Sequence, residues 1–437
     1  MKTLIDRCKA RCLAGEALSR EEIITLLDIP VGSDDDRYLR AAARDAAAKI
    51  TANRGYIWCA VGMDFAPCPM NCKFCSFGEK WQLVREPRHV TQEEILRHIR
   101  YYAENGAAYI VLRTTEFYSI DTLLDYIPTI RREVPGDYAI ILNTGELDAI
   151  TAQRVSDAGV YGVYHALRLR EGVDTPFPVT QRVQTMQSVT QTPLKLISLV
   201  EPIGPEHTSA ELADRFLNTV ACGASIGGAM ARFPVPGTPL GDTERISDEQ
   251  MAHIIAVLRL SGGNTIRDIC VHPASPAAMQ SGANVLVVES GAIPRDTDFA
   301  ENDWAGTDME KAATLLRMAG YHPSVPNAAA PQKKCPCEGG NLEKYLQPIL
   351  LHILRNEALN GYAVRSRIAG YVTYRDRVPD MAATYRYLKL MRSRGLLTCN
   401  DGLYQCSEEG LRCLATWKQT ISDYIETLKV LQAQFDT

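Results

Sequence analysis

Short apolar runs alternate with amphipathic helical segments between residues 55 and 325, and this alternation constrains the fold more than any other feature of the chain. Eight runs have the length and the content of β-branched or aromatic residues that buried strands need, and most are followed by a segment with helical spacing. The runs are YIWCAVGM, AYIVLRT, YAIILNT, YGVYHAL, LKLISLV, GAMARFPV, TIRDICVH and ANVLVVES. Eight such units predict an α/β fold, a (β/α)8 barrel whose chemistry lies at the carboxyl ends of its strands.

The segments outside this alternation predict three further parts. Residues 1–50 read as a helical extension, in which Ser19 of SREEIITLLDIP is the expected N-cap. Residues 51–325 form the predicted barrel, and the Pro, Ala and Gly content of residues 326–340 indicates a linker. Residues 341–437 predict helices, a hairpin at Asp401-Gly402 and a long final helix, which together make a second, α+β domain.

Charge, hydropathy and cysteine usage exclude several classes of protein. The formal net charge is −5, whereas a protein whose main task is nucleic-acid binding is typically basic. No stretch approaches 18 uninterrupted apolar residues, so we expect no membrane span. The 13 cysteines are odd in number and irregularly spaced, and the N-terminus lacks the apolar run of a secretory signal. We therefore expect reduced thiols and a cytoplasmic location.

Three cysteines lie together in APCPMNCKFCSFGEKW, directly after the first predicted strand. Cys68, Cys72 and Cys75 have the spacing C-x3-C-x2-C. A closed zinc site needs four ligands, and no further Cys or His occurs before His89. An iron–sulfur cube held by three thiolates keeps one iron open to a small molecule. A zinc knuckle and a set of unligated core cysteines are the alternatives.

This motif, with Phe74 before the last cysteine and a barrel strand in front of it, resembles the radical S-adenosylmethionine (SAM) enzymes. The resemblance implies a TIM-type barrel, a [4Fe–4S] cluster held by the three cysteines, and SAM bound at the open iron near Phe74. In that family, one electron cleaves SAM to methionine and a 5′-deoxyadenosyl radical, which takes a hydrogen atom from a small-molecule substrate. The resemblance also implies an electron donor of the flavodoxin or ferredoxin type.

Further segments resemble the branch of biotin synthase, the hydrogenase maturases and methylornithine synthase. The resemblance implies that Glu116, in LRTTEFY, holds the amino group of SAM, although two threonines stand where the family has glycines. It implies that Arg182, in VTQRVQTM, pairs with the carboxylate of SAM. In VYHALRLREGVDTPF it offers Arg168, Arg170 and Glu171 as cofactor-binding residues, without deciding which arginine points inward.

Two residues are candidates for the substrate side of the site. Arg232 precedes a Pro-Gly turn, where the resemblance implies an arginine that grips an amino-acid carboxylate; an arginine paired with a neighbouring acid is the alternative. His272 faces the cavity or is a hydrogen-bonded core residue. The expected reaction is a rearrangement, bond cleavage or bond formation in a biosynthetic or cofactor-maturation step. An amino-acid-like substrate is the most natural class.

Two observations about cysteines concern whether the chain holds a second iron–sulfur cluster. Biotin synthase ligates a second cluster with cysteines on interior strands. The corresponding strands here, AYIVLRT and YAIILNT, contain no cysteine, which disfavours sulfur insertion. Cys335 and Cys337, in KKCPCEGG, are either part of an auxiliary metal site or two linker thiols without a metal.

The segment from ILLHILRNEALNGYAV to QCSEEG resembles the winged-helix domain of PadR-type regulators. The resemblance implies a recognition helix with a basic face and a homodimer through the C-terminal helix. The expected basic residues are Arg386, Lys389, Arg392 and Arg394, and those of the dimer seam are Trp417, Ile421, Tyr424 and Leu428. Because the wing TCNDGLYQ carries no Lys or Arg, dimerisation or protein docking is favoured over nucleic-acid binding. The alternative for the whole protein is a DNA-binding regulator whose barrel senses SAM or redox state.

Overall fold

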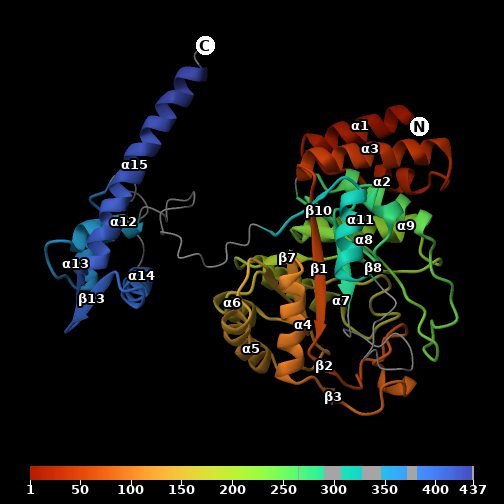
Figure 1. The fold of residues 1–437 in the computed structure, drawn as a ribbon, viewed down its shortest axis with the longest axis horizontal. Coiled ribbons are helices and arrows are strands. Elements are labelled where there is room, and N and C mark those ends of the chain that lie inside the picture. Colours follow the sequence, from red (N-terminus) through yellow and green to blue (C-terminus); the bar gives the residue numbers. More distant parts are fainter. Residues whose placement is uncertain (264, 290–306, 327–345, 372–380, 436–437) are drawn as a thin grey trace. The chain divides into compact units, whose positions relative to one another are not determined.

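The computed structural model describes residues 1–263, 265–289, 307–326, 346–371 and 381–435. The chain divides into two compact units, Met1–Ala330 and Pro331–Thr437 (Figure 1). Cys335 and Cys337 lie outside the described residues. Among the described residues, none of the helices combines the length and the hydrophobicity that a membrane span requires.

Eight parallel strands close into a barrel within the described part of the first unit, as the sequence predicts. Each strand pairs with the next along the chain, and the last pairs with the first. The strands are β1 (Arg54–Gly62), β4 (Tyr109–Arg113), β5 (Ala139–Asn143), β6 (Gly162–Tyr164), β7 (Lys195–Ile197), β9 (Ile226–Ala231), β10 (Asp268–His272) and β11 (Val285–Glu289). Nearly every residue of β1, β4 and β5 is buried, because one face lines the barrel and the other packs against helices.

Helices surround this barrel. They are α4 (Gln92–Glu104), α5 (Ile120–Glu133), α6 (Ala149–Asp157), α7 (Val179–Thr190), α8 (Ser209–Ala221), α9 (Asp248–Ser261), α10 (Pro276–Met279) and α11 (Met309–Met318). Capping boxes begin α4, α8 and α9 at Thr91, Thr208 and Ser247, so the side chains of the first turn satisfy backbone N–H groups that the helix leaves unpaired.

The fifth predicted strand, LKLISLV, is divided in the structure. β7 ends at Ile197, and pairing with β9 resumes as β8 (Val200–Ile203), with an irregular register between Val200 and Ile203. Pro202 lies inside β8 and has no N–H to donate to a regular ladder. Short pairings at β2 (Asp64–Phe65) with β3 (Arg88–His89), and at β12 (His322–Pro323) with β1, complete the strands described in this unit.

Three helices, α1 (Lys2–Leu13), α2 (Arg20–Leu27) and α3 (Asp34–Thr51), cover the end of the barrel where β1 begins (Figure 1). Ser19 caps α2 in a capping box, as predicted. The buried carboxylate of Asp36 lies 2.8 Å from Nδ1 of His253 in α9, which joins this layer to the barrel. The opposite end, where the strands finish, is left to loops.

The second unit consists of helices around one antiparallel hairpin. Its elements are α12 (Leu346–Leu354), α13 (Gly361–Ile368), α14 (Met381–Ser393), β13 (Leu397–Asn400), β14 (Leu403–Cys406) and α15 (Glu408–Phe435). The hairpin predicted at Asp401-Gly402 is confirmed: both residues have positive φ, at 51° and 76°, as the tight turn requires. A separate core of residues such as Leu350, Val364 and Leu388 holds this unit together.

Candidate active site

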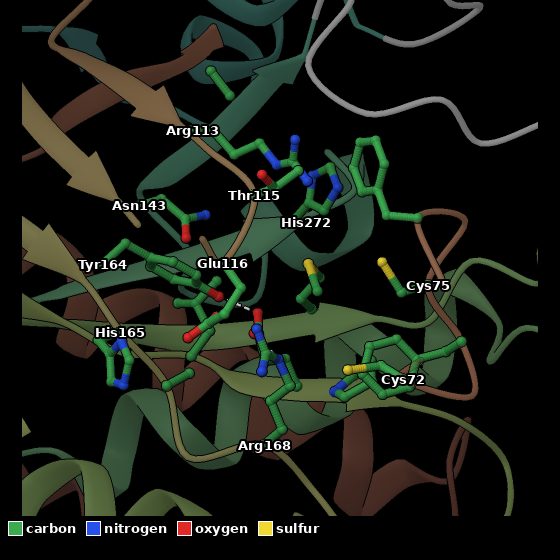
Figure 2. Close-up of a pocket in the computed structure, with 18 of the residues that line it drawn as sticks. Cys72, Cys75, Arg113, Thr115, Glu116, Asn143, Tyr164, His165, Arg168 and His272 are labelled. Atoms are coloured by element: carbon green, nitrogen blue, oxygen red, sulfur yellow. Dashed lines mark hydrogen bonds and ion pairs between the residues drawn. The ribbon is translucent and has the colours of Figure 1, made fainter. Parts of the chain in front are cut away.

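A cavity of about 220 Å³ opens at the carboxyl ends of the barrel strands. Side chains from strands on every side reach it, among them Trp58, Val111, Asn143, Tyr164 and Met230. Loops that follow the strands supply its charged groups and its thiols (Figure 2). The location is the one that barrel topology predicts for a reactive centre.

The three cysteines lie on one loop and all line this cavity. The backbone N–H of Cys68 donates to the carbonyl of Phe77 over 2.6 Å, and that of Cys75 donates to the carbonyl of Cys72 over 3.0 Å. Burial raises the pKa of the Cys68 thiol and raises that of Cys72 to about 12. A thiol in this environment stays protonated at neutral pH unless a metal displaces its proton, so iron binding and deprotonation are coupled.

Two neighbouring loops hold the cysteine loop in place. The N–H of Lys73 donates to the carbonyl of Asp174 over 2.9 Å, and its side chain forms an ion pair with the same residue at 2.9 Å. The carbonyl of Lys73 accepts from the N–H of Leu240 over 3.0 Å. The segments after β6 and β9 therefore fix the position of the thiols.

Glu116 lines the cavity beyond the end of β4, and its two preceding threonines turn their hydroxyls into the protein. Oγ1 and the backbone N–H of Thr115 both donate to the buried carboxylate of Asp64, the latter over 2.7 Å. Oγ1 of Thr114 lies 3.0 Å from Oγ1 of Thr144. Burial raises the pKa of Glu116. Thr115 is thus accommodated by Asp64 and Thr114 by Thr144, two partners that sequence reasoning missed.

Arg182, in the first turn of α7, lies buried at the cavity wall with much of its guanidinium unpaired. Nη1 is 3.0 Å from Glu146 and 3.2 Å from Nε2 of His165, and the group packs 3.9 Å from the ring centroid of Phe177. Nε and Nη2 are buried and make no hydrogen bond within the described residues. Burial opposes ionisation of Glu146, but the contacts with His165, Arg182 and Thr185 outweigh it and lower its pKa to about 2. This arginine is therefore a charged donor without a full set of acceptors.

The structure distinguishes the two arginines that follow β6. Arg168 lines the cavity, where Figure 2 shows it reaching toward the space shared with Glu116. Arg170 points elsewhere: Nε donates to Glu211 over 3.0 Å and Nη2 donates to the carbonyl of Glu206 over 2.9 Å. A positive φ of 53° at Arg170 turns the chain between the two arginines.

Glu171, the third cofactor-binding candidate in this segment, is buried behind the wall. Its carboxylate accepts from the backbone N–H of Arg168 over 2.8 Å and lies 3.7 Å from Nε of Arg182. It therefore orients both cavity arginines, and it is not one of the residues that line the cavity. Phe74, in contrast, lines the cavity beside the cysteines.

The two substrate-side candidates also line the cavity, but both Nη atoms of Arg232 are already paired, and only its Nε makes no hydrogen bond within the described residues. Both Nη atoms donate to the carboxylate of Glu206, and Nη2 also donates to Thr243 over 3.0 Å. The structure thus brings Arg232 to the site in the paired form that the sequence left as the alternative. His272 is buried at the end of β10, and its ring centroid lies 5.7 Å from that of Phe233.

A buried acid inside the barrel mouth was not among the predicted residues. Glu201 of β8 is 3% exposed and lines the cavity. The hydroxyl of Tyr164 donates to its Oε2, and Nε of Arg168 lies 3.6 Å from its Oε1. Burial raises the pKa of Glu201. One signal in the sequence could have found it, namely a carboxylate in the otherwise apolar run LISLVEPI.

These side chains fit a cluster with SAM bound to it. Three thiols on one loop supply an incomplete ligand set, which suits a cube with one open iron. SAM carries an ammonium and a carboxylate on its methionine moiety. The desolvated carboxylate of Glu116 suits the ammonium, and the unfilled Nε and Nη2 of Arg182 suit the carboxylate.

Comparison with known proteins gives the same assignment. Residues 66–178 match the model of the radical SAM superfamily. Biotin synthase 2 of Corynebacterium diphtheriae is 22% identical over 337 residues, which cover 72% of this chain and 95% of the relative. Biotin synthase of Akkermansia muciniphila is 22% identical over 283 residues, 61% of this chain and 86% of the relative.

Solved structures share the fold at lower identity. Methylornithine synthase (PylB) superposes with a TM-score of 0.58 and 17% identity, covering 72% of this chain and 97% of that one. The [FeFe]-hydrogenase maturase HydG gives a TM-score of 0.64 and 13% identity, covering 90% and 94%. The matched residues include all three cysteines, Glu116 and Arg168. The segment that carries the cysteine loop is therefore similar to the radical SAM superfamily, and the whole barrel is similar in fold to these solved structures.

Proposed function

We propose that this protein is an enzyme that uses reductive cleavage of SAM to abstract a hydrogen atom from a small molecule held inside the barrel. The observation that carries the proposal is the single cavity shared by the cysteine loop, the SAM-binding candidates and the barrel interior. When bound, the cluster and SAM supply the 5′-deoxyadenosyl radical. The final step is a rearrangement, bond cleavage or bond formation in a biosynthetic or cofactor-maturation sequence.

The side chains around the cavity have distinct proposed tasks. Cys68, Cys72 and Cys75 ligate the cluster. Glu116 accepts the ammonium of the methionine moiety, and Arg182 donates to its carboxylate. Glu171 orients Arg168 and Arg182 from behind, so it acts as a positioning residue. His165 and Glu146 hold Nη1 of Arg182 on the side away from its unfilled donors.

The apolar walls keep water away from the place where hydrogen abstraction occurs. Trp58, Val111, Leu199 and Val287 are each at most 8% exposed and line the cavity. Their confinement of the space limits side reactions of a radical with solvent. Both Nη atoms of Arg232 are paired with Glu206, so we assign this ion pair to closing the rim of the cavity. We assign the recognition of substrate to other residues.

The test is anaerobic reconstitution of the full chain with iron and sulfide, followed by reduction in the presence of SAM. We expect one cluster per chain and formation of 5′-deoxyadenosine and methionine. Cellular metabolites that raise the rate of 5′-deoxyadenosine formation then identify the substrate. A reconstituted protein that binds iron but yields no 5′-deoxyadenosine with a flavodoxin, ferredoxin or dithionite as reductant contradicts the proposal.

For the second unit we propose a PadR-like winged helix that forms a homodimer. The hairpin between α14 and α15 has the place of a wing, and α15 is 28 residues long. Trp417 is 2% exposed and packs within its own unit, whereas Ile421 and Ile425, further along α15, are 38% and 47% exposed. The side chains of Tyr424 and Leu428 lie outside the described residues; their positions, 7 and 11 residues after Trp417, have the helical spacing expected of one face.

The dimer is tested by light scattering of the full chain. Ile421→Glu should convert a dimer into a monomer while iron content stays unchanged. A wild-type chain that is monomeric at all concentrations removes this part of the proposal. A specific shift of promoter DNA would instead favour the regulator alternative.

A further inference from the structure

We infer that Glu201 and Tyr164 form the substrate-recognition site of the cavity and that they select a molecule with a protonated amine. This inference rests on the proposed function, because it concerns the substrate of the same cavity. The sequence resemblance assigned no role to either residue.

The carboxylate of Glu201 has incomplete hydrogen bonding. A carboxylate has about four acceptor positions, and buried polar atoms in folded proteins are almost always satisfied. Within the described residues, its side chain accepts one hydrogen bond, from Tyr164 to Oε2. The nearest charged donor to Oε1 is Nε of Arg168 at 3.6 Å, which is an ion pair beyond hydrogen-bonding distance. Oε1 is therefore left for a donor that the cavity receives.

The position of Glu201 directs its carboxylate to the cavity. β8 lies on the barrel wall after the break at the end of β7, and its irregular pairing with β9 brings Glu201 among the lining residues. Tyr164 stands on β6, and Figure 2 shows it extending into the same space as Glu116 and Arg168. Thus the open oxygen belongs to the cavity interior.

Aromatic and aliphatic side chains surround Glu201. The ring of Trp58 packs edge-on against that of Tyr164, with centroids 5.4 Å apart and an interplanar angle of 83°. Leu199, Met230 and Val287 complete the apolar lining. Arg168 balances only part of the charge of Glu201, because it also faces Glu171, whose Oε1 lies 3.9 Å from its Nη1. A cation beside the two aromatic rings compensates the remaining negative charge, and the rings attract it as well. An alcohol offers the hydrogen bond without the charge, and a carboxylate is repelled.

The experiment uses the reconstituted holoprotein with SAM and three probes of equal chain length: n-butylammonium, n-butanol and butyrate. Binding is measured by saturation-transfer NMR titration. We expect wild type to bind butylammonium at least about tenfold more tightly than butanol, the range for a hydrogen bond to a charged group. Glu201→Gln should remove that preference. Glu133→Gln, at an exposed position on α5, is the matched control and should retain it.

Each outcome decides between the inference and its rivals. Equal binding of butylammonium and butanol by wild type overturns the inference, and so does a preference that survives in Glu201→Gln at matched iron content. If Glu201→Gln fails to fold or to hold iron, the wild-type comparison of the three probes still decides whether the cavity selects a cation. The proposed function has its own readout. Normal 5′-deoxyadenosine formation without a preference for the amine contradicts the inference alone. Absence of SAM cleavage contradicts the proposed function.

Discussion

Two buried arginines, one at each end of the barrel, differ in how many of their nitrogens make hydrogen bonds. At the end covered by α1, α2 and α3, the guanidinium of Arg259 is 1% exposed and donates from all three nitrogens, to the carbonyls of Gly282 and Arg267 and to Oδ1 of Asn284. At the mouth, Arg182 is 2% exposed, and two of its nitrogens make no hydrogen bond within the described residues.

This contrast distinguishes buried charges that stabilise the fold from buried charges that can bind a ligand. A buried charge with every donor filled contributes to stability through its partners, and its removal leaves those partners unsatisfied. A buried charge with open donors costs free energy in the folded state, so it persists where a ligand completes it. Mutations at the two ends should therefore separate stability from binding.

The largest effect is expected at the cysteine loop of the mouth. Cys68→Ala, Cys72→Ala or Cys75→Ala should abolish reductive cleavage of SAM, because a cube with two protein ligands is not retained in the reactive form. Iron content and 5′-deoxyadenosine formation measure the loss. Cys222→Ala, after α8, is the control and should leave both unchanged. Turnover above background in the triple variant would refute the assignment.

At the closed end, Arg259→Met should lower the free energy of unfolding by about 3 kcal/mol, because three acceptors lose a charged donor and two of these hydrogen bonds are buried. Urea unfolding of the full chain, followed by circular dichroism, measures it. A loss below about 1 kcal/mol, the typical cost of an ordinary substitution, would show that the paired charge is not holding this end together.

At the mouth, Arg182→Met should weaken SAM binding by about 10-fold to 100-fold, corresponding to ~1.5–3 kcal/mol for a hydrogen bond to a charged group. It should cost less stability than Arg259→Met, since only Nη1 of Arg182 has partners within hydrogen-bonding distance, Glu146 and His165, whereas Arg259 donates from all three nitrogens. Equilibrium binding of SAM to the reconstituted protein and the same urea titration give both numbers. A larger loss of stability for Arg182→Met than for Arg259→Met would contradict the proposed difference between the two arginines.

The two ends should also respond oppositely to pH, by less than about 2 kcal/mol. Burial opposes ionisation of Asp36, but hydrogen bonds from Gly32, His253 and Arg40 outweigh it and lower its pKa. The stability it contributes is present above the ordinary pKa of an aspartate and is lost as the pH falls through the lowered value. For Glu201, burial raises the pKa, so the folded protein loses stability as the pH rises from the ordinary glutamate value through the raised one.

Unfolding free energies between pH 3 and pH 8 test this contrast. The deficit of Asp36→Asn should be largest at neutral pH and shrink toward pH 3, whereas Glu201→Gln should gain on wild type as the pH rises. Parallel pH profiles for the two variants would mean that Glu201 is not held in a desolvated setting.

The smallest effect is expected outside the described residues. Cys335→Ala combined with Cys337→Ala should leave iron at about four per chain, the value for a single cube. Iron analysis of the double variant beside wild type measures this. A reproducible loss of iron would reveal an auxiliary site and reopen sulfur chemistry.

The sequence predicted what depends on local pattern. The barrel followed from the alternation of strands and helices, the N-cap at Ser19 from its neighbouring acids, and the hairpin at Asp401 from a two-residue turn. The likeness to radical SAM enzymes was predicted from the spacing of three cysteines, and residues 66–178 match the model of that superfamily. The winged-helix identity and the proposed roles of site residues remain predictions.

What the sequence could not predict depends on register and on distant partners. Arg168 and Arg170 are two residues apart, and one positive φ decides which reaches the cavity. Glu206 lies 26 residues before Arg232, and its capture of the guanidinium follows only from how two loops meet. Glu201 faces the interior because the fifth strand breaks, which hydrophobic pattern alone does not reveal.

The hydrogen bonds from Thr115 to Asp64 have a consequence for sequence variation. A side chain at position 115 is accommodated because a carboxylate 51 residues earlier accepts its hydroxyl. The two positions should therefore be inherited together: relatives with Thr at 115 should retain an acceptor at 64, and relatives with Gly at 115 should be free to lose it. In this region, co-inheritance of a residue pair would be a more reliable guide to relationship than either residue alone.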